Sequence, residues 1–185
     1  EPEAYYTAYA LWGLHLAKQA GYRVDAKRIS DGLEYLRSRT EQPGEPPPYY
    51  NEAGELGSQA FALYVRAVLG DKDPQAATTL LTKPQMPLYG KAFLARALAA
   101  GISPRERAVV RLVDELATAA NAATKTEALI DEPGNYHSYM SSSLRTTAIV
   151  LAALVELDPK NAAIPPLVRT IMKHRRSNDY LDTQE

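Results

Sequence analysis

The sequence predicts an all-α protein built from repeated pairs of helices. Four helical segments of about three turns combine alanine with bulky apolar residues, and they contain residues 7–11, 59–63, 91–95 and 147–151. A turn signal follows each of these segments. A second, more amphipathic stretch then follows the turn, most clearly at residues 25–39 and 105–119. Together these observations predict four hairpins, each with an inner and an outer helix.

The four alanine-rich segments are apolar around most of their circumference. Helices of this kind lie inside a structure, and their alanine faces allow neighbouring helices to approach closely. We therefore expect these segments to form a buried inner layer.

Turn residues separate the helices. Glycines that can adopt the left-handed conformation at the end of a helix follow the first three segments, at Gly21, Gly70 and Gly101. A capping residue precedes each following helix, at Asp25, Asp73 and Ser103. Asp73 and Ser103 are each followed by a proline, which fits the first turn of a helix. The fourth segment continues directly into Asp158 and Pro159.

The predicted outer helices each carry one apolar stripe. In residues 25–39 the stripe consists of Ile29, Leu33 and Leu36. In residues 105–119 it consists of Val109, Leu112, Val113 and Leu116. These stripes are expected to face the inner layer.

Repeated helical hairpins can close into an alpha/alpha toroid or continue as an open solenoid. The apolar inner helices favour closure, because a solenoid usually keeps a polar concave face. Two stretches interrupt the repeat. Residues 41–51 contain four prolines and predict a polyproline-like loop. Residues 124–139 hold a short extended candidate at 127–130 and a turn at 131–134, which predict a small hairpin or an ordered loop.

Composition limits the function. The 185 residues suit one domain or most of one, and a net charge of -1 gives no basic surface for nucleic acid. Cysteine is absent, which removes disulfides, thiolate nucleophiles and cysteine zinc sites from this chain. His15, His137 and His174 lack metal-ligand spacing, so we expect no metal and no cofactor. The longest apolar stretch, near 148–155, is too short to enter and cross a membrane.

Four short motifs carry a resemblance to a known family. Residues 5–11 (YYTAYAL) resemble the "WLTAYV" helix of alpha-2-macroglobulin and complement thioester domains, and residues 20–24 (AGYRV) resemble the "AGY-V" turn of bacterial members. Residues 141–148 (SSSLRTTA) are similar to "SSLRDNA", and residues 180–185 (YLDTQE) are similar to "WLSTQE". Because the four motifs occur in the family's order, the chain is identified as similar to a bacterial alpha-2-macroglobulin thioester domain.

The resemblance implies a closed toroid of six helix pairs. Eight of the helices of such a toroid are expected in this chain. Residues 1–185 would then be a single partial thioester domain, a fragment lacking roughly the first three helices and the last one. The family's Cys-x-Glu-Gln thioester motif belongs to the upstream part, and this sequence contains no match to it. The implied function is that of an endopeptidase inhibitor, not an enzyme, which traps proteases and captures them covalently.

The resemblance also implies partners and a location. Target proteases would act on the full-length protein, and other macroglobulin domains of the same chain would contact this one. The family places such a protein in the periplasm or outside the cell, with a parent that can be lipid-anchored.

The same resemblance points to Tyr49 and Tyr50. Their loop lies near the thioester rim in relatives, where complement proteins that prefer hydroxyl targets place a catalytic histidine. No histidine lies between Arg39 and Gly57. We hypothesise that Tyr49 or Tyr50 shields the thioester from water; the alternative is that both tyrosines only cover the apolar end of the toroid.

Other functions stay open at this point. Tyr136, His137 and Ser138 are adjacent, but neighbours in a loop rarely face each other as a triad does. Terpene cyclases and protein prenyltransferases also use alpha/alpha toroids, although their acidic and zinc-binding motifs are absent here. A large hydrophobic central cavity would favour such an enzyme. An open superhelix with a polar groove would favour a non-covalent helical-repeat binding module.

Overall fold

The computed structural model describes residues 4–41, 52–131 and 142–177. These residues form eight α-helices and no strand, which confirms the all-α prediction. The helices are α1 (Ala4–Gln19), α2 (Ala26–Glu41), α3 (Glu52–Val68), α4 (Pro74–Leu81), α5 (Leu88–Gly101), α6 (Arg107–Lys125), α7 (Ser143–Leu157) and α8 (Ile164–Ser177).

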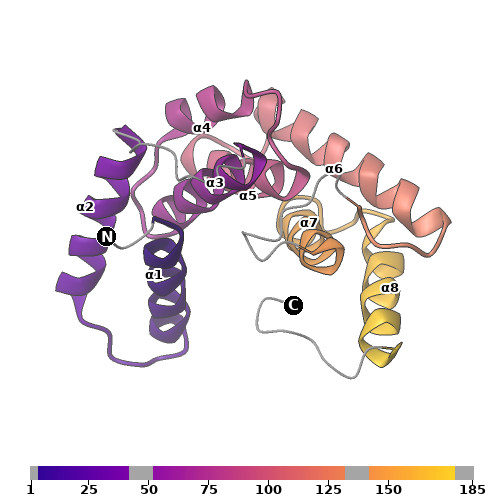
Figure 1. The fold of residues 1–185 in the computed structure, drawn as a ribbon, viewed down its shortest axis with the longest axis horizontal. Helices are drawn as coiled ribbons and strands as arrows, with labels where there is room; N and C mark the ends of the chain where they lie inside the picture. The colour runs from indigo at the N-terminus through magenta and orange to yellow at the C-terminus, as the bar shows by residue number, and fades with distance from the viewer. Residues whose placement is uncertain (1–3, 42–51, 132–141, 178–185) are drawn as a thin grey trace.

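The helices form an arch with two layers (Figure 1). In the inner layer α1 packs on α3, α3 on α5 and α5 on α7, and these four helices contain the four alanine-rich segments. The outer helices α2, α4, α6 and α8 pack against this layer. In Figure 1, α1 and α2 lie at one end of the arch and α8 lies at the other. The described helices therefore have the arrangement of part of an alpha/alpha toroid.

Helices α3, α5 and α7 of the inner layer run parallel to one another. Residues near the starts of neighbouring helices meet each other, and residues near the ends do the same. The pairs are Gly57 with Tyr89, Tyr64 with Arg96, Tyr89 with Arg145, and Arg96 with Glu156. All three of α3, α5 and α7 therefore begin at the same end of the arch.

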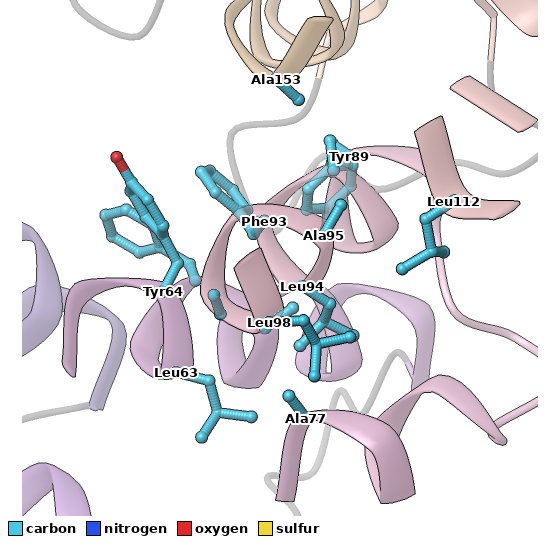
Figure 2. Close-up of a cluster of buried hydrophobic side chains, with 14 of the residues drawn as sticks. Leu63, Tyr64, Ala77, Tyr89, Phe93, Leu94, Ala95, Leu98, Leu112 and Ala153 are labelled. Carbon is cyan, nitrogen blue, oxygen red and sulfur yellow. The ribbon is translucent and has the colours of Figure 1, made fainter. Parts of the chain in front are cut away.

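Helix α5 lies at the centre of the core. It packs against α3, α4, α6 and α7, and its residues Leu94 and Leu98 are fully buried. Figure 2 shows α5 surrounded by side chains from these four neighbours. Small residues such as Ala92 and Ala95, both completely buried, let the neighbouring helices approach.

The outer helices bury the predicted stripes. On α6, Val109, Leu112 and Leu116 are buried, and Val113 packs partly against the core. On α2, Leu36 is fully buried, while Ile29 and Leu33 are partly buried.

Two of the three predicted glycine turns are confirmed. Gly21 and Gly70 have φ angles of 87° and 94°, in the left-handed region. Helix α5 does end at Gly101, but the left-handed conformation expected there is wrong, because Gly101 is still helical and the Ile102 N–H donates to the Leu98 carbonyl. Helix α6 starts at Arg107, two residues later than predicted.

The structure describes only parts of the two predicted interruptions of the repeat. Glu41 is still the last residue of α2, and residues 42–51 of the predicted loop lie outside the described residues. Residues 127–131 form no strand. They are held against α7 because the Ile130 N–H donates to Thr147 Oγ1 at 2.9 Å. The remainder of the predicted hairpin lies outside the described residues.

Candidate functional site

The candidate site is the end of the arch at which the inner helices begin. The residues singled out from the sequence, Tyr49 and Tyr50, precede α3, but they lie outside the described residues. The segment that holds Tyr136, His137 and Ser138 precedes α7 and also lies outside them. The described residues that follow these two segments in the chain are the first turns of α3 and α7, and α5 begins at the same end of the arch.

The first turn of α7 is fixed by hydroxyl groups. The Ser142 side chain caps the helix by accepting from the Arg145 N–H at 3.0 Å. Ser143 Oγ donates to Asp131 Oδ1 at 3.1 Å, and Thr147 Oγ1 donates to the Ser143 carbonyl. These bonds tie the chain before α7 to the helix, and they assign a structural role to Ser142 and Ser143 of the 141–148 motif.

Arg145 lies almost completely inside the protein. Only 7% of the residue is exposed, and its guanidinium carbon lies 4.9 Å from the centre of the Tyr89 ring. Its Nη1 atom is buried and has no hydrogen-bond partner in the structure. Sequence reasoning missed this residue, because no local pattern distinguishes it from an exposed arginine.

The first turns of α3 and α5 are joined at the same end. The Tyr89 ring lies against Gly57, leaving no room there for a side chain. Gln85 Nε2, in the segment before α5, donates to Glu52 Oε2 at 2.7 Å. This end of the inner layer is therefore a closely packed surface of helix starts.

Farther along the inner helices, aromatic rings contact one another in a continuous series. Ring centres 5.0–6.4 Å apart connect Tyr5, Tyr9, Trp12, Phe61, Tyr64 and Phe93. Figure 2 shows Tyr64 and Phe93 side by side, on the opposite side of the layer from Leu63 and Ala77. These rings pack on each other, as expected for a filled interior.

Arg96 connects this aromatic series to α7. Its guanidinium carbon lies 4.1 Å from the centre of the Tyr64 ring, and its Nε donates to Glu156 Oε2 at 2.7 Å. Burial raises the pKa of the Tyr64 hydroxyl, the positive charge of Arg96 lowers it, and the negative charge of Glu156 raises it; the net pKa is above the ordinary value.

A second buried arginine has a structural role. Arg66 Nε bonds Asp71 Oδ2 at 2.8 Å, and Arg66 Nη2 lies 3.6 Å from Asp73. Arg37 of α2 bonds the other oxygen of Asp71 at 3.1 Å. This network joins α2, the end of α3 and the turn before α4.

The outer layer contains a groove with a volume of about 520 Å³. It lies between the end of α2, α3 and α4, and both polar and apolar side chains line it, among them Thr40, Gln59, Leu63 and Leu80.

The described residues offer no metal site, because no three of their His, Asp and Glu side chains could hold an ion together. His15 is half-buried on α1 and His174 lies in the last turn of α8. His137 lies outside the described residues. Within the described chain, no helix has the length and apolar character needed to cross a membrane.

Comparison with solved structures gives matches along the whole chain, whereas no family model and no curated protein matches the sequence. Salmonella alpha-2-macroglobulin reacted with methylamine matches with a TM-score of 0.80 and 23% identity. Native Escherichia coli alpha-2-macroglobulin, from domain MG7 to the C-terminus, matches with a TM-score of 0.77 and 24% sequence identity. The chain has the fold of a segment of bacterial alpha-2-macroglobulins. It spans only 12% and 28% of the length of these two chains.

The alpha-2-macroglobulin fold accounts for the motifs read from the sequence. Residues 5–11 lie in inner helix α1, and residues 20–24 form the turn in which Gly21 has a positive φ. Residues 142–148 cap and begin inner helix α7. The last motif, residues 180–185, lies outside the described residues.

Proposed function

We propose that this chain is part of the thioester domain of an alpha-2-macroglobulin-like endopeptidase inhibitor. The observation that carries the proposal is the fold, which matches bacterial alpha-2-macroglobulins over 100% of the chain with TM-scores of 0.76–0.80. The four sequence motifs also support the proposal. One lies in α1, one forms the turn after α1, and a third begins α7.

The proposed chemistry is a single covalent capture. In the parent protein a cysteine thiol and a glutamine acyl group form a thioester, and both lie outside this cysteine-free chain. A lysine amine of a trapped protease attacks the acyl carbon, the C–S bond breaks, and an amide forms. The leaving thiolate takes up the proton that the amine loses, so that the cysteine ends as a free thiol. Because the thioester is consumed, the protein is an inhibitor and not an enzyme.

The exposed face of α1 supports a larger ring. Among the described helices, α1 has one inner neighbour, α3, and its large side chains Tyr6, Tyr9 and Leu16 are 56%, 40% and 42% exposed. An inner helix of a complete toroid has a neighbour on both sides. We infer that residues 1–185 are one partial domain and that further helices of the parent pack on this face of α1.

Proteases are the proposed partners, together with the other macroglobulin domains of the parent chain. Two matching E. coli alpha-2-macroglobulin structures are of the protein activated by trypsin and by porcine elastase. A bacterial periplasmic or extracellular location, with a parent that can be lipid-anchored, fits this role.

Tyr49 and Tyr50 are the proposed shielding residues, since the chain enters α3 two residues after Tyr50. In the complete protein, Tyr50→Ala is expected to accelerate hydrolysis of the thioester. An unchanged hydrolysis rate in a folded Tyr50→Ala protein would leave both tyrosines with only a packing role.

Two other functions receive no support from the described residues. The aromatic rings of the inner layer fill space instead of lining a cavity, which argues against a cyclase-like or prenyltransferase-like enzyme. The groove between α2, α3 and α4 lies away from the concave side that a repeat-type binding module uses.

The test is the intact mass of the parent protein with and without methylamine. We expect the mass of one methylamine to be added and one free thiol to appear. A folded parent that gains neither would contradict covalent capture, although the shared fold would stand.

A further inference from the structure

We propose that Arg145 is an anion-binding residue that takes a carboxylate group at the end of the arch where α5 and α7 begin. The residue is 7% exposed, and its Nη1 atom is buried with no hydrogen-bond partner. A charge withdrawn from water is costly unless a counter-charge or hydrogen bonds compensate for the loss. The Tyr89 ring, 4.9 Å from the guanidinium carbon, attracts the cation but brings no counter-charge.

The other buried arginine shows what is missing at Arg145. Nη1 of Arg66 also lacks a partner, but Arg66 contacts the carboxylates of Asp71 and Asp73. No ion pair of this kind joins Arg145 to a carboxylate in the described part of the chain.

The described carboxylates near this end are already engaged by neutral donors. Asp131 accepts from Ser143, and Glu52 accepts from Gln85. Glu55 accepts from Gln59 at 3.2 Å. None of these three carboxylates contacts Arg145 in an ion pair, so a negative charge beside its guanidinium is still lacking among them.

The helix starts add to the attraction for an anion. The N-terminal ends of α5 and α7 carry partial positive charge, and both lie at this end of the arch. Helix α5 follows Pro87, and no side chain caps its first turn. A single carboxylate fits the site best, because it balances one guanidinium and can accept two parallel N–H bonds from it.

The carboxylate can belong to a small free acid or to an acidic side chain of a longer polypeptide. Sodium formate serves as the first probe. The second probe is N-acetylglutamic acid α-amide, whose side-chain carboxylate is free. The experiment is a thermal unfolding titration of the 185-residue chain at constant ionic strength, with chloride replaced by the probe. Arg145→Met removes the charge but keeps an unbranched stem, and Arg111→Met at an exposed position of α6 is the matched control.

In the unmodified chain and in Arg111→Met, the midpoint temperature is expected to rise and to saturate with at least one probe. In Arg145→Met the apparent affinity is expected to fall by at least about tenfold, as for the loss of one charge-assisted hydrogen bond. Saturation with formate alone assigns the site to a free acid, and saturation with the glutamate derivative assigns it to an acidic side chain.

The proposal is overturned by the absence of a saturable effect with both probes, or by an equal effect in Arg145→Met. If Arg145→Met does not fold, the guanidinium ¹⁵N resonances of the unmodified chain decide the question. A change in the chemical shift of one arginine resonance upon titration with either probe supports the site. In Arg145→Lys this change should be absent or should appear at the new lysine amine. Unchanged resonances in the unmodified chain overturn the proposal. This inference does not depend on the thioester, so the methylamine experiment cannot settle it in either direction.

Discussion

The hydroxyl end of the Tyr89 ring lies directly against the backbone of Gly57. A Cβ atom built on Gly57 would be 2.2 Å from Tyr89 Oη and 2.4 Å from the neighbouring ring carbons. Helices α3 and α5 reach this separation only because position 57 has no side chain. The guanidinium of Arg145, a residue of α7, lies over the same ring. One tyrosine of α5 therefore contacts residues near the starts of both α3 and α7.

Gly57→Ala is therefore expected to destabilise the fold. Overpacking costs about 1–3 kcal/mol, and the higher helix propensity of alanine offsets only part of this cost. We expect a net loss of about 1–2 kcal/mol in urea unfolding monitored by circular dichroism. Gly13→Ala in α1, where no atom lies within 4 Å of the new Cβ, is the control and should be neutral or stabilising. Equal effects at both positions would show that Tyr89 moves away at little cost.

The helical repeat could be predicted from the sequence because its cause is local. Alanine-rich apolar segments mark the inner helices, and the stripe of Val109, Leu112 and Leu116 marks an outer one. Helix ends were predicted less well. Gly101 looks like a stop signal, yet it stays helical beside Pro74, and only packing with α4 distinguishes it from Gly21 and Gly70.

A pair of alanine substitutions separates these two kinds of glycine. At Gly70, with a φ of 94°, an alanine side chain is strained, and we expect Gly70→Ala to lose about 1–2 kcal/mol. At Gly101 the new Cβ would lie 3.6 Å from Pro74 carbons, an ordinary contact, and Gly101→Ala should gain about 0.5 kcal/mol. A loss at Gly101 similar to that at Gly70 would contradict the helical conformation found here.

The buried arginines could not be predicted from the sequence. Arg66 and Arg145 follow no different local pattern from exposed arginines, and their burial depends on which helices pack over them. Arg66 pairs with Asp71 and Asp73, which follow it closely in the chain, but Arg37, which also binds Asp71, comes from α2. Tyr49 and Tyr50 stay predictions, because their segment lies outside the described residues.

The Arg66 network makes stability depend on pH. Burial by itself would raise the pKa of Asp71, but hydrogen bonds from Arg66 and Arg37, and their positive charges, hold it below its ordinary value of 3.8. A carboxyl whose pKa is lowered on folding stabilises the protein above its unfolded pKa. That contribution is lost as the pH falls through the folded pKa.

Asp71→Asn is accordingly expected to be less stable than the unmodified chain at pH 7. The difference between the two should shrink as the pH falls from about 5 towards 2, because protonation removes the same charge from the unmodified chain. Urea unfolding at a series of pH values measures this difference. Asp114→Asn, at an exposed position of α6, is the control and should leave the pH profile unchanged. A constant difference over the whole range would contradict a role for the Asp71 charge.

The two charges near Tyr64 should act on its pKa in opposite directions. Because Arg96 lowers the pKa of the buried hydroxyl, Arg96→Met is expected to raise it further. Because Glu156 raises the pKa, Glu156→Gln is expected to lower it. The measurement is an alkaline titration of the tyrosine ζ-carbon resonances, with Tyr64→Phe used to assign the signal. Neutral Tyr64 is stabilised in the folded state, so its contribution to stability is present below about pH 10 and is lost at higher pH. Shifts of the same sign in both variants would mean that altered burial, and not charge, controls this hydroxyl.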